Sequence, residues 1–400
     1  MKRVLYYLLF FIFVVLCSCT DETDDAIGGE SYSTSLGLFD GSAEGASSFP
    51  ISENGDSTQQ YEPGVITAGE WNDLENWDFW YKLMEEDTFG FASKYWEIYP
   101  IRNRYSLLVK NRSGQPVVDL LVTLRYGKAN VWQARTDNKG KAEFWTDPYS
   151  GIKNQSISNL KFYIDGKLVN QVVIPFDQGI NTITYDKTTR PSALDVVFVV
   201  DATGSMGDEL EYLKTEVLDV INDVKTSNSQ LDVKMGSVFY RDEGDAYITR
   251  VSQITNNIQS TVDFIKAQSA DGGGDYPEAV HSAVKDAVEQ LSWSPDAVAR
   301  IMFLVLDAPP HYHPSVINSI QEDIKHAAEK GIKIIPVSAS GIDKGTEFLL
   351  RFMSVLSNGT YVFITDHSGI GNEHLTPTIG EYEVEYLNEL MVRLINEYVE

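Results

Sequence analysis

The 400-residue sequence contains only two cysteines, Cys17 and Cys19, and both lie close to its first residue. The rest of the chain therefore offers no disulfide and no thiolate ligand for a metal. Histidine is also rare, with six residues scattered along the sequence, so a metal site built from histidines is not indicated. Lysine and arginine are outnumbered 32 to 58 by aspartate and glutamate, giving a formal net charge of −26. This charge argues against nucleic acid as a general partner and suits an affinity for cations.

Residues 1–18 have the organisation of a secretory signal peptide. Lys2 and Arg3 precede an uncharged apolar run over 4–16 that is too short for a comfortable transmembrane helix. The run ends in Leu-Cys-Ser-Cys, which resembles the lipobox of bacterial lipoproteins. That resemblance implies cleavage before Cys19, lipidation of Cys19 and anchoring in a bacterial outer membrane. A plain signal peptide with incidental cysteines is the alternative.

An acidic stretch of low complexity follows the cysteines. Residues 20–25 read Thr-Asp-Glu-Thr-Asp-Asp, which resembles the surface-export signal of lipoproteins in Bacteroides-like bacteria. The resemblance implies display on the cell surface, with the periplasmic face of the outer membrane as the alternative. From residue 19 to residue 68, Ser, Gly, Glu, Asp and Thr dominate without periodicity, which predicts a flexible acidic tether.

Residues 69–99 are dense in tryptophan, tyrosine and phenylalanine. An aromatic segment of this kind is expected to dock a linker onto a neighbouring domain. Stacking of exposed aromatic rings on carbohydrate is the alternative function for it.

Residues 100–189 alternate apolar and polar side chains in short runs that are separated by turn sequences. Two of these turns are Asp-Asn-Lys-Gly at 137–140 and Asp-Gly at 165–166. Short strands at regular spacing predict an antiparallel β-sandwich. The segments 114–117 and 136–144 resemble carboxypeptidase-regulatory-like and bacterial immunoglobulin-like modules. The resemblance implies a spacer or an adhesive module, and we find no catalytic constellation in it.

Over residues 190–400 the pattern changes to strands that alternate with helices. Apolar runs predict strands near 194–201, 231–240, 299–306, 332–338 and 360–364. Amphipathic spacing predicts a helix from 206 and further helices near 254–268, 277–291, 315–330, 345–356 and 381–399. This alternation predicts a doubly wound, mostly parallel α/β sheet. Ligands bind such sheets at the carboxyl ends of the strands, so the residues that follow the strands form the candidate site.

Asp201, Thr203 and Ser205 lie where a buried apolar run meets the helix that follows it. One carboxylate and two hydroxyls offer hard oxygen donors, which suit a divalent cation such as Mg²⁺. The alternative is that these side chains only cap the helix. Two further segments are expected at the same sheet edge: Asp-Gly-Gly-Gly-Asp-Tyr-Pro-Glu at 271–278, and Asp307 at the end of a strand.

These three motifs together resemble the von Willebrand factor A domain and its metal-ion-dependent adhesion site. The resemblance implies one Mg²⁺ or Mn²⁺ ion held by Asp201, Thr203, Ser205 and Asp307. It also implies a protein partner, which completes the coordination shell of the ion through an acidic side chain.

The glycine-rich loop departs from the family pattern. Asp275 falls where the family has a threonine, and Asp271 and Glu278 are the alternatives for the loop ligand. A third carboxylate beside the ion should hold it more tightly and attract a partner's acid less.

Two other functions compete with metal-dependent recognition. Thr-Gly-Ser-Met-Gly at 203–207 is one residue away from the G-x-S-x-G elbow of hydrolases, and Ser205, Asp307 and His311 follow in the hydrolase order. The spacing from Asp307 to His311 is short for that fold, and Asp201 would have no role, so we expect the protein not to be an enzyme. The remaining alternative is a structural scaffold stiffened by the metal.

Overall fold

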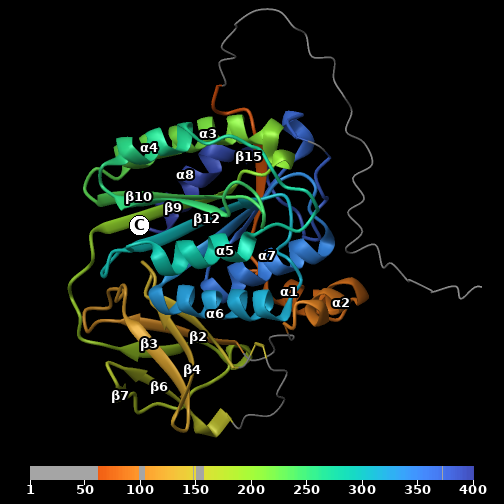
Figure 1. The fold of residues 1–400 in the computed structure, drawn as a ribbon. Helices are drawn as coiled ribbons and strands as arrows, with labels where there is room; N and C mark the ends of the chain where they lie inside the picture. Colours follow the sequence, from red (N-terminus) through yellow and green to blue (C-terminus); the bar gives the residue numbers. More distant parts are fainter. Residues whose placement is uncertain (1–61, 99–103, 147, 150–156, 372) are drawn as a thin grey trace, which may run out of the picture. The chain divides into compact units, whose positions relative to one another are not determined.

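The computed structural model describes residues 62–98, 104–146, 148–149, 157–371 and 373–400, which are drawn in colour in Figure 1. The predicted signal peptide, the lipidation site Cys19 and most of the tether lie outside the described residues. Within the described part of the chain, no helix is both long enough and apolar enough to cross a bilayer.

An eight-stranded sheet forms the larger body, with the strand order β11-β10-β9-β12-β13-β14-β1-β15. The five strands from β10 to β14 in this order run parallel, whereas β11, β1 and β15 are antiparallel to their neighbours. In the order of the chain the strands are β1 (Thr67–Trp71), β9 (Ala193–Asp201), β10 (Asp232–Tyr240), β11 (Thr249–Thr255), β12 (Ala299–Leu306), β13 (Ile332–Ser338), β14 (Tyr361–Ile364) and β15 (Glu385–Tyr386). The predicted α/β fold with a mostly parallel sheet is confirmed.

Helices cover both faces of this sheet (Figure 1). One face carries α3 (Gly207–Ser227), α4 (Ile258–Lys266) and α8 (Leu387–Glu397), and the other carries α5 (Val280–Lys285), α6 (Pro314–Lys330) and α7 (Lys344–Ser357). Successive side chains of a strand point to opposite faces, so β9 contributes to two cores. Val196 and Phe198 pack on the side of α3 and α8, whereas Val197 and Val199 pack on the side of α5, α6 and α7.

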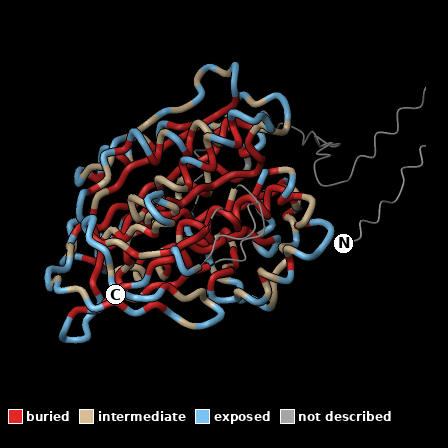
Figure 2. Tube along the Cα trace, turned by 90° about the horizontal axis from the view of Figure 1, so that it is seen from below, coloured by how far each residue is buried: buried red, intermediate tan, exposed pale blue. Residues whose placement is uncertain are grey.

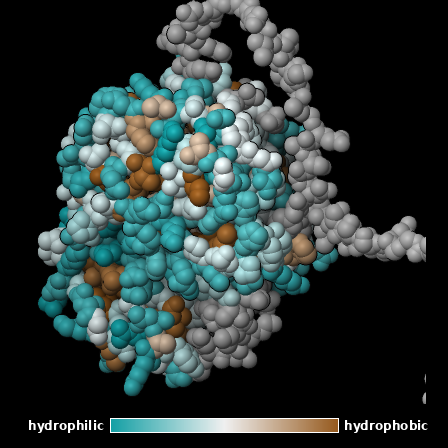
Figure 3. Space-filling view, in the orientation of Figure 1, coloured by the Kyte–Doolittle hydropathy of each residue, from teal (hydrophilic) through white to brown (hydrophobic). Residues whose placement is uncertain are grey.

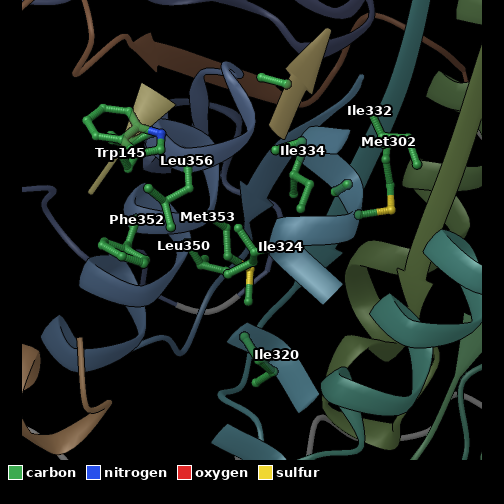
Figure 4. Packing of buried hydrophobic residues seen from close by; sticks show 14 of the residues in the cluster. Trp145, Met302, Ile320, Ile324, Ile332, Ile334, Leu350, Phe352, Met353 and Leu356 are labelled. Atoms are coloured by element: carbon green, nitrogen blue, oxygen red, sulfur yellow. The ribbon is translucent and has the colours of Figure 1, made fainter. Parts of the chain in front are cut away.

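Burial on both faces explains why the central strands are continuous apolar runs. Figure 2 shows buried residues throughout the interior of the described chain, with exposed residues mainly in the loops. Figure 4 shows Ile334 of β13 in one core together with Ile324 of α6 and Met353 of α7. The face in Figure 3 is mainly hydrophilic, with small separate apolar spots.

The aromatic segment docks onto the α/β body, as the sequence predicts, and it also contributes a strand to the sheet, which the sequence did not predict. β1 pairs with β14 and β15, so the boundary predicted at residue 68 falls inside a strand of the sheet. The helices α1 (Trp77–Leu83) and α2 (Asp87–Tyr95) follow, and Trp80 stacks on Phe348 of α7 with ring centroids 5.9 Å apart. Trp80 and Phe89 thus pack against α7, whereas Trp77 packs against Trp145.

Two smaller sheets lie between β1 and β9 in the sequence. One has the order β5-β2-β8, with β2 (Arg104–Lys110), β5 (Lys141–Trp145) and β8 (Asn181–Thr184). The other has the order β4-β3-β6-β7, with β3 (Leu121–Tyr126), β4 (Ala129–Arg135), β6 (Leu160–Ile164) and β7 (Lys167–Leu168). All pairs are antiparallel except β2 with β8, which is parallel because the chain crosses over before β8. The predicted antiparallel strands are therefore present in both sheets, and β2 with β8 is the exception among the described pairs.

Candidate metal centre

Three loops meet at the carboxyl edge of the parallel strands. β9 ends at Asp201, and a short 3₁₀ turn connects it to α3. Backbone hydrogen bonds join this turn to the glycine-rich loop, from Gly204 N–H to Gly272 O at 3.1 Å. The same loop is joined to the segment after β12 by Glu278 N–H, which donates to Pro309 O at 2.9 Å. The topology therefore gathers the three predicted motifs in one place.

Asp201 is fully buried at the centre of the first motif, and the hydroxyl groups of Thr203 and Ser205 lie beside it. Asp201 Oδ1 accepts from Thr203 N–H at 2.8 Å and from Thr203 Oγ1 at 2.7 Å, and Thr203 Oγ1 lies 3.1 Å from Ser205 Oγ. Asp201 Oδ2 accepts no hydrogen bond of normal geometry, although the Tyr240 hydroxyl lies close enough to lower the pKa of Asp201. No side chain caps the 3₁₀ turn or α3, so helix capping does not account for these residues.

Asp307 and Glu278 add two more buried carboxyl groups to this edge. Asp307 Oδ1 and Glu278 Oε2 also accept no hydrogen bond of normal geometry. Burial, followed by the neighbouring charges of Asp201, Asp242 and Asp307, raises the pKa of Glu278 to about 9. Burial and the charge of Asp201 likewise raise the pKa of Asp307 well above its usual range. The carboxyl groups are therefore close enough to repel one another when no cation lies between them.

The loop candidates of the sequence have different positions. Asp275 is exposed, and the side chain of Asp271 is 79% exposed and forms an ion pair with Arg241 at 3.3 Å. Glu278 instead lies at the cluster, and a Cβ atom at Gly273 would come within 3.0 Å of Glu278 Oε1. Glu278 thus lies buried at the predicted site, whereas Asp275 is exposed.

Asp242 is a further carboxylate of this edge, which the sequence did not identify as a ligand. It lies two residues after β10, and its charge contributes to the raised pKa of both Asp201 and Glu278. Its position after a parallel strand was the signal that could have identified it. Asp242 also accepts a hydrogen bond from His311, with Nε2 and Oδ1 2.6 Å apart.

This bond bears on the hydrolase alternative. His311 contacts Asp242, and none of the hydrogen bonds found among the described residues joins His311 to Ser205. A serine nucleophile needs a base within hydrogen-bond reach. The geometry therefore gives no support to a triad of Ser205, Asp307 and His311.

Replacing Glu278 with glutamine should flatten the pH dependence of stability in the presence of a chelator. The pKa of Glu278 is about 4.5 in the unfolded chain and about 9 in the folded one. Between these values the folded state retains a proton that the unfolded state loses, so the free energy of unfolding falls as pH rises. Each unit of pKa difference contributes about 1.4 kcal/mol. Between about pH 5 and about pH 8, the free energy of unfolding measured in urea should therefore fall less for Glu278→Gln than for the wild type. Asp275→Asn, an exposed control, should keep the wild-type slope, and an unchanged slope in Glu278→Gln would contradict the placement of this carboxylate.

Comparisons with known proteins bear on the α/β body. Residues 195–372 match the family model of the von Willebrand factor type A domain. The alpha-protein kinase vwkA of Dictyostelium discoideum is 31% identical over 190 residues, which cover 46% of this chain and 29% of that protein. The putative ariadne-like RING finger protein R811 of Acanthamoeba polyphaga mimivirus is 29% identical over 133 residues, covering 33% of this chain and 13% of that protein. The chain thus spans less than a third of the length of these relatives.

Two solved structures resemble about half of the chain. The conserved hypothetical protein BatB from Bacteroides thetaiotaomicron has 13% identity and a TM-score of 0.36, covering 51% of this chain and 98% of that one. The pilus adhesin SpaC from Lactobacillus rhamnosus GG has 11% identity and a TM-score of 0.38, covering 53% of this chain and 30% of that one. The segment that matches the family model contains Asp201, Glu278 and Asp307 at the carboxyl edge of the parallel strands. The family model thus identifies a von Willebrand factor type A domain at residues 195–372.

Proposed function

We propose that the von Willebrand factor type A domain of this chain holds one divalent cation, Mg²⁺ or Mn²⁺, and uses it to recognise a protein partner. The observation that carries this proposal is the set of three buried carboxyl groups, Asp201, Asp307 and Glu278, each with an oxygen that accepts no hydrogen bond of normal geometry. Burying such charges without compensation is costly, and a cation between them would offset the cost. Hydroxyl groups of Thr203 and Ser205 complete a donor set of hard oxygens.

The number of carboxylates bears on what the partner supplies. Three carboxylates carry more negative charge than one divalent ion balances, so the ion would be held firmly. Mg²⁺ also keeps several waters when protein carboxylates bind it, and a partner can displace one of them. An acidic side chain of the partner remains the expected ligand, but the excess charge weakens the demand for it. We propose no catalytic role for Ser205.

The remaining parts of the chain fit a cell-envelope protein. We propose that lipid on Cys19 anchors the protein in a bacterial outer membrane, with the domains displayed at the cell surface. This rests on the resemblance of the first residues to a lipoprotein signal and of 20–25 to an export signal. The β-sandwich would then act as a spacer between the anchor and the metal-binding domain.

Capture of a partner from the native envelope tests this function. The tagged full-length protein should retain a partner in the presence of Mg²⁺ and release it in chelator. Asp201→Ala should capture nothing, whereas Asp275→Ala, which removes an exposed carboxylate, should behave as the wild type. Equal capture in Mg²⁺ and chelator would contradict metal-dependent recognition. Stabilisation by Mg²⁺ without any captured partner would instead favour a scaffold, and labelling of Ser205 by a fluorophosphonate without metal would favour a hydrolase.

A further inference from the structure

A second group of metal-ligating side chains lies where α6 meets a π-helical turn, η4 (Asp286–Gln290). Glu289 comes from η4, and Asp323 and His326 come from successive turns of α6. Each side chain offers one ligand atom, and these atoms all lie within 4.8 Å of one another. Among the described residues, no other group of three histidine, cysteine or acidic residues meets this criterion. The carboxyl oxygens of Asp201, Glu278 and Asp307 lie farther apart, so at the first site some of them would reach the ion through water.

The burial of Asp323 distinguishes this group from an ordinary surface ion pair. Asp323 is only 4% exposed, and its Oδ2 accepts a hydrogen bond from Ser319 Oγ at 3.2 Å. None of the hydrogen bonds or ion pairs found in the described chain reaches its Oδ1, and the ligand atoms of His326 and Glu289 lie within 4.8 Å of the ligand atom of Asp323. A carboxylate buried to this extent is stabilised by a cation placed beside it.

Two side chains already contact Glu289 and would compete with a metal ion for its carboxylate. Glu289 Oε1 lies 2.7 Å from His326 Nδ1, and Glu289 Oε2 accepts from Lys330 Nζ at 2.9 Å. Lys330 also donates to the carbonyl oxygen of Val288 at 2.7 Å. One carboxylate oxygen of Glu289 is therefore held by Lys330, and the other faces the imidazole nitrogen.

We propose that Glu289, Asp323 and His326 form a second divalent metal site, selective for a borderline ion such as Zn²⁺. One imidazole nitrogen with two carboxylates suits Zn²⁺ better than Mg²⁺, which prefers oxygen ligands alone. Three protein ligands leave a position for water. Ser319 would orient Asp323 as an outer-shell partner. Composition argued against a site built from histidines, but one histidine is enough here because the acidic residues supply the other ligands.

Calorimetric titration of Zn²⁺ into the full chain, with Mg²⁺ in excess, tests this site. The wild type should bind one equivalent of Zn²⁺, and His326→Ala should lose it. His367→Ala, which removes an exposed imidazole elsewhere, should keep it. Ser319→Ala should weaken binding about 10-fold, because outer-shell partners typically contribute 10- to 100-fold. Lys330→Gln should bind more tightly, because it removes a competing positive charge from Glu289.

Further variants make the outcome independent of the Mg²⁺ site. Asp201→Asn should still bind one equivalent of Zn²⁺, whether or not the first site binds its own ion. Circular dichroism without metal should show that His326→Ala and Asp323→Asn are folded. The proposal is overturned if the wild type takes up no Zn²⁺ in excess Mg²⁺, if folded His326→Ala keeps the equivalent, or if His367→Ala loses it as well.

Discussion

Arg351→Ala should lower the free energy of unfolding by about 3–5 kcal/mol, because it breaks a buried ion pair from one side. Arg351 is fully buried and donates to both carboxylate oxygens of Asp73, at 2.9 and 2.6 Å, and to Glu347 at 3.0 Å. Without the guanidinium, the buried carboxylate of Asp73 loses its positive partner, whereas Glu347 keeps its ion pair with Lys344 at 2.8 Å. Since Asp73 follows β1 and Arg351 lies in α7, the loss would show that residues 62–98 stabilise the α/β body.

Arg393→Ala provides the matched control for this variant. Arg393 also binds the segment before the sandwich, through Glu70 at 2.9 Å, but its side chain is 36% exposed. Surface ion pairs contribute about 0–1 kcal/mol, so the effect should be much smaller. Urea unfolding in chelator measures both variants. Equal losses for Arg351→Ala and Arg393→Ala would contradict the role assigned to the buried pair.

Asp201→Asn should remove the stabilisation that Mg²⁺ gives to the wild type. A ligand that binds only the folded state at 100 times its Kd adds about 2.7 kcal/mol to the free energy of unfolding. Asparagine retains the oxygen that accepts the two bonds from Thr203, but it removes the buried charge. In chelator the variant should therefore be at least as stable as the wild type at neutral pH. Thermal unfolding with and without Mg²⁺ measures both effects.

A purely local role for Asp201 predicts the opposite pattern. If the carboxylate only organised the turn before α3, its replacement would cost about 1 kcal/mol in chelator, as loss of a cap does. Mg²⁺ would then stabilise the variant and the wild type equally. Asp275→Asn should respond to Mg²⁺ as the wild type does, because the Asp275 side chain is exposed and is not part of the buried set of carboxyl groups.

The sequence was sufficient to predict the α/β sheet because its central strands are buried on both faces. The run from Val196 to Val200 is apolar at every position, and the helices between the strands have clear amphipathic spacing. β1 carried no such signal. Its sequence Thr-Ala-Gly-Glu-Trp is short and mixed, and its insertion beside β14 depends on contacts between segments far apart in the chain. Only the folded topology reveals that the tether ends in a sheet strand.

The parts of the candidate site that lie at strand ends could be predicted from the sequence. Asp201 ends β9 and Asp307 follows β12, and sheet geometry places the ends of these parallel strands together. The choice between Asp275 and Glu278 depends on the path of a glycine-rich loop. Gly273 has a φ of 71°, and Glu278 is bonded through its backbone to Pro309. Neither feature follows from residue spacing, and both decide which carboxylate reaches the site.

Calorimetric titration of Mg²⁺ into the wild type, Glu278→Gln and Asp275→Asn tests the central claim most directly. The claim is that Glu278 completes a divalent cation site with Asp201, Asp307 and the two hydroxyl groups of the first motif. One ion should bind the wild type and Asp275→Asn with equal affinity, and Glu278→Gln should bind it at least about 10-fold more weakly, as expected for loss of a ligand or its partner. Absence of Mg²⁺ binding by the wild type, or a loss confined to Asp275→Asn, would contradict the account.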